Sequence, residues 1–379
     1  MPDHRDASAG HTRVLVVQPN VLPYRRAFWE AATLRAASIG FDLRICHAAK
    51  DHEWKNSSEN DELVNAHTVR AVELMHRPFR VNFRYTLGCM SVFKPNLVVL
   101  PLARGDLEAY LHILHARIGG PRIAWWGHGS RTFDAREPQG RLSKLDVSLA
   151  KQGDWFFAYS ERGASCLARL GFSDACISVL QNTFDTQVLR MDINSVSDDD
   201  LRSFRERYVL TPGRTALFLG TLSSIKGVST LLQVVELIKD QVPGFHLLIG
   251  GTGPLEDDVR YAADSYSQVS YLGRLDGPAK ALALRAADLL LIPRSIGLVA
   301  VDSLVSGVPI VTVANGGHGP EVAYLADGRT SVFTKESVDA YSGEVANLFE
   351  NPAELLRLSE NCRTHSEEYT LDVMVSNFT

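Results

Sequence analysis

The sequence contains little that is typical of a secreted or membrane-spanning protein. Its five cysteines are scattered over 379 residues without a C-x-x-C pair, so we expect reduced, structural thiols. No apolar run approaches the roughly 20 residues that a membrane helix needs, and residues 1–12 lack the apolar core of a signal peptide. These absences predict a cytoplasmic protein.

Charge is unevenly distributed along the chain. The net charge is -5, yet residues 1–181 carry 23 Lys and Arg against 18 Asp and Glu, whereas the remainder carries 16 against 26. A basic first half suits an anionic surface or acceptor, so peripheral contact with the inner face of a membrane stays open as an alternative. We expect no nucleic-acid partner.

Apolar runs rich in Val, Ile, Leu and aromatic residues alternate with helical patterns throughout the chain. The first half contains the runs "RVLVVQPN", "FDLRICHA", "NLVVLPL", "PRIAWWGHG", "DWFFAYS" and "ISVLQN". The second half restarts the pattern with "TALFLGTL", "FHLLIGGTGP", "VSYLGRL", "DLLLIPR", "VPIVTVA" and "TSVFTK". Such alternation is typical of parallel sheets covered on both faces. The sequence therefore predicts two doubly wound α/β domains.

Strand patterning stops in a polar stretch near the middle of the chain, which marks the domain boundary. We predict an N-terminal domain, a linker with a first helix, a C-terminal domain and a helix returning to the first domain, over residues 1–185, 186–213, 214–362 and 363–379. In the linker, "SVSDDDLRSFRER" predicts a helix with Ser197 as its N-cap. Asp198 and Asp200 also form a D-x-D pattern that can bind metal, but their place at a polar helix start favours capping.

Ligands of open α/β sheets bind beyond the carboxyl ends of the strands. Several loops of the second half follow predicted strands and are therefore expected at this edge. "FLGTLSSIKGVSTLLQ" places Gly220 at a strand end and Lys226 directly before a helix, where an ammonium and free N–H groups suit phosphate. A solvated lysine is the alternative. Gly251 and Gly253 in "LLIGGTGPLEDDV" permit close backbone approach or a tight connection. "VSYLGRL" ends a strand at Arg274, where backbone can meet a flat base.

The stretch "IPRSIGLVAVDSLVSGVPIV" places a carboxylate, Asp302, among apolar residues. A buried, unpaired charge is costly, so a partner must bond it. Gly297, Leu298 and Val299 would form the first turn of a helix, whose free N–H groups can hold a diphosphate. Asp302 lies one turn further on and can accept both hydroxyls of a ribose.

The order of these motifs, GTL-x-x-x-KG, GGTGP, LGRL and "ADLLLIPRSIGLVAVDSLVSGVPIV", resembles the nucleotide-binding domain of glycosyltransferase family 4 over about residues 214–335. The family consists of retaining enzymes of the GT-B fold, in which two doubly wound parallel-sheet (Rossmann-like) domains face each other across a cleft. The resemblance implies a metal-independent hexosyl- or pentosyltransferase. It also implies no cofactor, a nucleotide-diphosphate sugar as co-substrate, and a glycan or lipid-linked glycan as acceptor.

Two departures from the family pattern concern the diphosphate. The family's last motif usually reads E-G-F-G-L-x-x-L-E-A, which aligns Asp302 with the second, ribose-binding acid and Arg294 with the first. The arginine of the family's G-R-L motif is Thr221 here. We hypothesise that Arg294 takes over part of the diphosphate clamp beside Lys226, so that both cations stabilise the leaving group. A surface ion pair of Arg294 is the alternative.

The first half resembles the family only in architecture and a few loops, and it is expected to hold the acceptor. "PRIAWWGHGSR" ends a strand with His128 between two glycines, where an imidazole can bond the donor sugar or stabilise developing charge, as in related enzymes. Tyr24 and Arg25 follow the first strand, and Arg104 follows a later one; these are candidate acceptor or phosphate ligands. For Tyr24 and Arg25, a helix-start cluster with Phe28 and Trp29 in the core is the alternative.

Two rival functions stay open at this point. A non-catalytic nucleotide-sugar-binding homologue or partner subunit would bind donor without turnover. A non-hydrolysing nucleotide-sugar epimerase would turn over donor without an acceptor, but no acid-rich site is evident in the first half.

Overall fold

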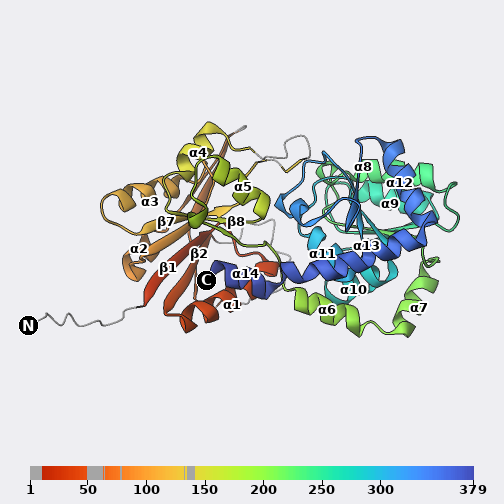
Figure 1. The fold of residues 1–379 in the computed structure, drawn as a ribbon, viewed down its shortest axis with the longest axis horizontal. Helices are drawn as coiled ribbons and strands as arrows, with labels where there is room; N and C mark the ends of the chain where they lie inside the picture. Colours follow the sequence, from red (N-terminus) through yellow and green to blue (C-terminus); the bar gives the residue numbers. More distant parts are fainter. Residues whose placement is uncertain (1–10, 49–62, 64, 77–78, 132, 135–140) are drawn as a thin grey trace, which may run out of the picture.

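The computed structural model describes residues 11–48, 63, 65–76, 79–131, 133–134 and 141–379. These residues form two parallel sheets in two lobes that lie side by side, with helices packed against each sheet (Figure 1). The expected pair of doubly wound α/β domains is therefore confirmed.

The N-terminal sheet has seven parallel strands in the order β3-β2-β1-β6-β7-β8-β9. They are β1 (Thr12–Gln18), β2 (Phe41–Ala48), β3 (Ala66–Val69), β6 (Leu97–Pro101), β7 (Arg122–Gly127), β8 (Trp155–Ala158) and β9 (Ile177–Val179). The strand order reverses at β1, which pairs with both β2 and β6. The loops after β1 and β6 therefore leave the carboxyl edge of the sheet in opposite directions. Ligands of such sheets bind in the crevice between loops of this kind.

Helices cover both faces of the N-terminal sheet, because neighbouring residues of a strand point to opposite faces. Trp126 lies in one core, with α1 (Arg26–Ser38) and α14 (Leu371–Phe378). Trp125 lies in the other core, with α2 (Leu87–Phe93), α3 (Leu107–Arg117), α4 (Lys144–Ala150) and α5 (Glu161–Arg169). Phe28 and Trp29 of α1 are fully buried, as the helix-start alternative expects.

The C-terminal sheet has six parallel strands in the order β12-β11-β10-β13-β14-β15. They are β10 (Thr215–Leu219), β11 (His246–Gly250), β12 (Val269–Gly273), β13 (Leu289–Leu291), β14 (Ile310–Val313) and β15 (Ser331–Thr334). The helices of this lobe are α8 (Val228–Ile238), α9 (Glu256–Ser265), α10 (Gly277–Ala286), α11 (Val299–Ser306), α12 (Val338–Glu350) and α13 (Pro352–His365). The central strands β10, β11 and β13 are buried along their whole length.

The segment between the two sheets forms helices α6 (Thr186–Ser195) and α7 (Asp198–Arg207). The Ser197 hydroxyl accepts a hydrogen bond from the Asp200 N–H at 3.1 Å, which confirms the predicted N-cap. At the other end of the chain, α13 runs along the C-terminal lobe and α14 packs against α1 (Figure 1). The chain therefore returns to the first lobe as expected, although the returning helix begins at Leu371 rather than at residue 363.

All twelve apolar runs singled out in the sequence contain strands of the two sheets. Strand β3 and the antiparallel hairpin β4 (Ala71–His76) and β5 (Phe79–Arg84) were not predicted. Their segments are short and mix apolar with polar residues, so they do not stand out as buried runs.

Candidate functional site

Lys226 ends a short 3₁₀ helix, Ser224–Lys226, directly before α8. Its ammonium donates a hydrogen bond to the Ser295 carbonyl, and a Cβ on Gly297 would lie 4.0 Å from the same nitrogen. Burial lowers the pKa of the Lys226 amine, and the Glu321 carboxylate opposes this shift. The predicted phosphate-binding lysine therefore lies against the loop that opens α11, rather than extending into solvent.

The loop from Ser295 to Val299 brings backbone donors to the same point. Ser295 has a φ of 53°, a left-handed conformation that is unfavourable for a non-glycine residue and often found at functional sites. Among the described residues, the N–H groups of Gly297, Leu298 and Val299 have no backbone acceptor. They lie at the N-terminal, positive end of α11, beside the Lys226 ammonium. This corner can bind an anion such as a diphosphate.

The glycines after β11 bring two loops into backbone contact. A Cβ on Gly251 would lie 1.8 Å from the Gly220 carbonyl oxygen, and one on Gly253 would lie 2.5 Å from that of Leu222. Their φ angles of 144° and 158° also disfavour side chains. Both glycines therefore permit a tight connection, which was one of the two alternatives that the sequence allowed. They also hold the Gly220 loop in place.

The buried carboxylate of Asp302 has a partner within the protein. Lys280, on α10, places its ammonium 2.8 Å from Asp302 Oδ1 and 4.9 Å from the centre of the Phe184 ring. Burial lowers the pKa of the Lys280 amine, but Asp302 and two further aspartates outweigh it and the pKa is raised overall. Sequence analysis missed Lys280, which looks like an ordinary lysine in the first turn of a helix. The ribose contact of Asp302 stays a prediction.

Two further predicted donor residues lie at strand ends and are exposed. Thr221 follows β10, and Arg274 follows β12. The Arg274 guanidinium pairs with Asp276 at 2.7 Å, and both side chains are largely exposed. Neither residue is held in a fixed position by burial, so their contacts with a nucleotide stay predictions.

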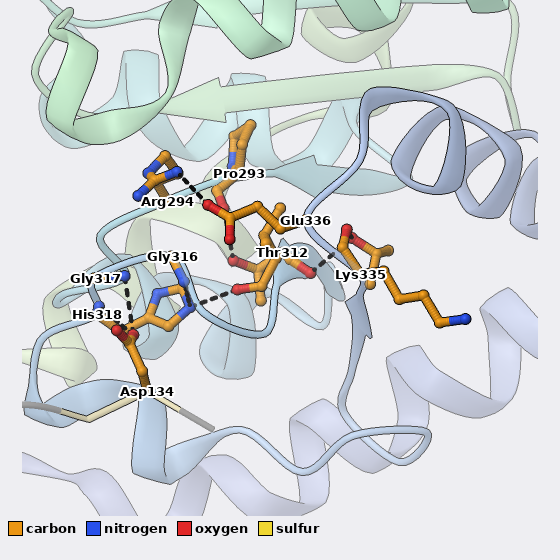
Figure 2. Close-up of polar contacts among 11 residues, drawn as sticks. Asp134, Pro293, Arg294, Thr312, Gly316, Gly317, His318, Lys335 and Glu336 are labelled. Atoms are coloured by element: carbon orange, nitrogen blue, oxygen red, sulfur yellow. Dashed lines mark hydrogen bonds and ion pairs between the residues drawn. The ribbon is translucent and has the colours of Figure 1, made fainter. Parts of the chain in front are cut away.

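The Arg294 guanidinium pairs with Glu336 at 3.1 Å, and both side chains are about two-fifths exposed (Figure 2). A Cβ on Gly227 would lie 3.1 Å from Arg294 Cγ, so the arginine stem crosses the turn that follows Lys226. The ion pair corresponds to the alternative given for Arg294. Its position on the turn would also permit Arg294 to contact a diphosphate, and this contact stays a prediction.

A pocket of about 640 Å³ lies at the carboxyl edge of the N-terminal sheet. Loops after β1, β6 and β7 line it, and they bring together Tyr24, Arg25, Arg104 and His128. The His128 ring faces this pocket, 5.0 Å from the Tyr159 ring centre, and burial lowers the pKa of its imidazole. Arg104 is partly exposed and pairs with Asp146 at 2.8 Å. The four residues that sequence analysis named in the first half therefore share one concave site.

Arg25 lies in the pocket wall, yet both terminal nitrogens of its guanidinium have partners within the protein. It donates to the Thr183 carbonyl at 3.2 Å and to Asn182 Oδ1, and it contacts Met374 Sδ on α14. Tyr24 is exposed, with the Arg25 guanidinium 5.2 Å from its ring centre. Tyr24 can thus contact a ligand directly, whereas Arg25 mainly fixes the chain around the pocket.

A chain of polar contacts leads from the pocket to Glu321, whose charge also acts on the Lys226 ammonium. Asn182, which accepts from Arg25, donates to the carboxylate of the buried Glu321. Burial raises the pKa of Glu321, and the Asn182 hydrogen bond and the charges of Arg25 and Lys226 oppose the shift. Asn182 was not predicted, because its partners are 157 and 139 residues away in the sequence.

A second contact joins the lobes through the glycine loop after β14. Asp134 Oδ1 accepts hydrogen bonds from the N–H groups of Gly317 at 2.9 Å and His318 at 3.2 Å (Figure 2). The buried His318 ring accepts from the Ile296 N–H and bonds the Val313 carbonyl at 2.7 Å, so one nitrogen must be unprotonated. Burial lowers the pKa of His318, which agrees with a neutral ring. The glycine loop is thus fixed on both sides.

Comparisons with known proteins agree with this architecture. Residues 213–351 match the family model described as Glycosyl transferases group 1. Solved structures with the same fold include a glycosyltransferase from Rickettsia africae, with a TM-score of 0.70 and 14% identity over 97% of this chain and 96% of that one. Another is Anabaena HepE in complex with UDP, with a TM-score of 0.67 and 13% identity over 97% and 98%. The fold is therefore GT-B, with two Rossmann-like domains.

Part of the chain is similar to curated glycosyltransferases. The chain is 28% identical to D-inositol 3-phosphate glycosyltransferase of Corynebacterium glutamicum over 45% of its own length and 43% of the relative's. It is 31% identical to phosphatidyl-myo-inositol mannosyltransferase of Mycolicibacterium smegmatis over 36% and 38%. These alignments span less than half of each relative. Residues 213–351 are similar to the group 1 glycosyltransferases, which agrees with the resemblance to family 4 expected from the sequence.

Proposed function

We propose that this protein is a retaining glycosyltransferase that moves a hexosyl or pentosyl group from a nucleotide-diphosphate sugar to a hydroxyl acceptor. One observation carries the proposal. The Lys226 ammonium lies beside the N-terminus of α11, where three N–H groups lack backbone acceptors among the described residues. This arrangement suits a diphosphate, whose growing negative charge is what a transferase must stabilise as the sugar leaves.

The proposed reaction uses no protein nucleophile, cofactor or metal. The diphosphate departs, the acceptor hydroxyl attacks the same face of the sugar, and a phosphate oxygen helps to take its proton. Lys226 and the α11 N–H groups stabilise the leaving diphosphate, and Arg294 adds a second cation from the neighbouring turn. Asp302 accepts the ribose hydroxyls with its remaining acceptor capacity beside Lys280.

The acceptor is proposed to bind in the pocket of the N-terminal lobe. His128 faces the pocket, and its lowered pKa keeps the imidazole neutral near pH 7, so it can exchange hydrogen bonds with sugar hydroxyls. Tyr24 and Arg104 provide further polar contacts at the rim. We propose a glycan or lipid-linked glycan as acceptor, because two relatives are named for the hydroxyl-bearing substrates D-inositol 3-phosphate and phosphatidyl-myo-inositol, and because the N-terminal half is basic. The reaction would then take place in the cytoplasm or at the inner face of the membrane.

A turnover assay tests this proposal. Purified protein is incubated with uridine-, guanosine-, adenosine- and thymidine-diphosphate sugars and a set of glycan and lipid-linked glycan acceptors, with and without a metal chelator, and release of nucleoside diphosphate is measured. Wild type should release nucleoside diphosphate from one of these donors, and the chelator should not change the rate. Lys226→Ala should lower the rate by about 10²–10³-fold, a typical loss for one charge-stabilising group. Lys239→Ala, which removes a surface lysine paired with Glu236, serves as the matched control and should leave the rate unchanged.

The same assay distinguishes the rival functions. Binding of a nucleotide sugar without release of nucleotide would favour the non-catalytic homologue. Conversion of the sugar without nucleotide release would favour the epimerase.

A further inference from the structure

Helix α3 carries a row of apolar side chains on its exposed side, whereas its buried side mixes the apolar Ala109 and Ile113 with the polar Glu108 and His112. Its exposed side consists of residues spaced three or four apart along the helix and just beyond its end: Leu107, Tyr110, Leu111, Leu114 and Ile118. Leu114 is 58% exposed and Ile118 is 77% exposed. A surface helix normally buries such a row, so its exposure indicates a surface that something else covers.

The buried side of α3 explains why the helix cannot turn over. Glu108 lies on this side and forms a buried ion pair with Arg84, which also pairs with Asp106 at 2.9 Å. His112, one turn further, bonds the Thr86 hydroxyl at 2.9 Å. If α3 rotated to bury its leucines, the Glu108–Arg84 ion pair and the His112–Thr86 hydrogen bond would break. These polar pairs, together with Ala109 and Ile113 in the hydrophobic core, therefore keep the apolar row facing outward.

The apolar row lies on the outer surface of the N-terminal lobe. Helices α2 and α3 lie on the side of this lobe that faces away from the C-terminal lobe, and α4 lies at the top of the lobe in this view (Figure 1). Val92 on α2 is 81% exposed, and Leu145 on α4 is exposed as well. No element of the C-terminal lobe is therefore positioned to cover the row.

The charged residues around this surface are mainly basic. Residues 64–151 carry 13 Lys and Arg against 6 Asp and Glu. In α2, α3, α4 and the residues beside them, the exposed cations are Lys94, Arg104, Arg117, Arg122, Lys144 and Lys151. The acids of the same segments are Asp106 and Glu108, which are buried against Arg84, Asp146, which pairs with Arg104, and Asp154, which accepts a hydrogen bond from the Ile123 N–H. Apolar side chains bordered by cations match the interface of an anionic lipid bilayer.

The row also begins at the rim of the N-terminal pocket. Arg104 and Gly105 line the pocket, and α3 starts two residues later at Leu107. A bilayer in contact with α3 would therefore lie next to the pocket mouth. Among the described residues no helix combines the length and apolar character that crossing a membrane requires, so the contact would be peripheral.

We propose that the outward face of α3, with its flanking cations, docks the N-terminal lobe on an anionic lipid membrane. The apolar row inserts into the interfacial layer, and the cations contact the lipid phosphates. This surface lies outside the proposed donor site, so docking does not depend on nucleotide binding or on glycosyl transfer.

Vesicle co-sedimentation tests the docking surface. Wild type is mixed with vesicles of phosphatidylcholine and phosphatidylglycerol in equal parts, or of phosphatidylcholine alone, at low and high salt. It should bind the mixed vesicles, and salt should weaken the binding. Leu114→Glu/Ile118→Glu should reduce the bound fraction by about tenfold or more, because it places charge in the apolar row. Leu34→Glu is the matched control, since Leu34 is 74% exposed on α1, on the opposite face of the sheet.

The outcomes separate docking from other causes. Thermal melting of each variant checks folding, and Leu114→Ser/Ile118→Ser provides a milder version of the same change. Equal vesicle binding by wild type and both double variants would overturn the proposal, as would no binding by wild type. Self-association that the double variants abolish, without vesicle binding, would assign the surface to a second copy of the chain. Because nucleotide release is measured separately, failure here would leave the proposed reaction intact.

Discussion

The two lobes share one architecture but present their candidate sites in different ways. In the C-terminal lobe, the candidate donor residues belong to a few short loops, and Lys226, Gly297 and Val299 lie within two motifs. In the N-terminal lobe, the pocket collects residues that follow four different strands, from Tyr24 after β1 to Tyr159 after β8. A site built from short local motifs can be recognised in a sequence. A site assembled from distant segments needs the fold first.

The lobes also differ in how their loops are fixed. The C-terminal loops contact each other through backbone, which is why Gly251 accepts no side chain. The N-terminal pocket is held by side chains, and the buried Arg25 reaches the segment after β9 and α14. Backbone packing tolerates almost no substitution, whereas a side-chain network can lose one member and keep the rest.

Gly251→Ala should give the largest change in stability. The new Cβ would overlap the Gly220 carbonyl and adopt an unfavourable φ, so we expect a loss of about 2–4 kcal/mol of unfolding free energy. Gly343→Ala is the control: no atom lies within 4 Å of its new Cβ in α12, so it should gain about 0.5–1 kcal/mol. Urea unfolding followed by circular dichroism measures both.

Fluorescence sharpens this comparison, because the five tryptophans all lie between residues 29 and 155. Tryptophan emission therefore reports the N-terminal lobe. Gly251→Ala should shift the circular dichroism transition more than the fluorescence transition. Equal shifts would show that the two lobes unfold as one unit.

Asn182→Ala should have an intermediate effect. It removes the acceptor of Arg25 and the donor to Glu321, and leaving these buried groups without that partner costs about 1–3 kcal/mol. Because the network spans both lobes, the fluorescence and circular dichroism transitions should separate further than in wild type. Asn361→Ala removes an amide that bonds the Arg329 carbonyl within the C-terminal lobe, and should change neither probe by more than a few tenths of a kcal/mol. A loss no greater than that of the control would contradict the role of Asn182.

Arg294→Ala should change stability least. Its ion pair with Glu336 is partly exposed, and such pairs contribute about 0–1 kcal/mol. If Arg294 also contacts the diphosphate, Arg294→Ala should weaken nucleoside-diphosphate binding severalfold, whereas Glu336→Gln should not. Isothermal titration calorimetry on both variants measures this. Equal nucleotide affinities of wild type and Arg294→Ala would show that Arg294 forms only the surface ion pair and does not bind the diphosphate.

Much of the fold was predictable, because buried parallel strands leave long apolar runs in the sequence. The candidate site was predictable only in part. Lys226 and the glycine loops were found because their spacing is local. Lys280 was missed, since its pairing with Asp302 depends on how α10 packs beside α11. The same holds for Asn182, whose partners lie more than a hundred residues away, and for the outward leucines of α3, which composition alone cannot orient.

The central claim is that Lys226 and the N-terminus of α11 hold the diphosphate of a nucleotide sugar. A thermal-shift titration of uridine, guanosine, adenosine and thymidine diphosphates on wild type and Lys226→Ala tests it most directly. One nucleotide should raise the melting temperature of wild type, since ligand at 100 times its Kd adds about 2.7 kcal/mol of stability. Lys226→Ala should lose most of that shift. Equal shifts in the two proteins, or no shift with any nucleotide, would contradict the claim.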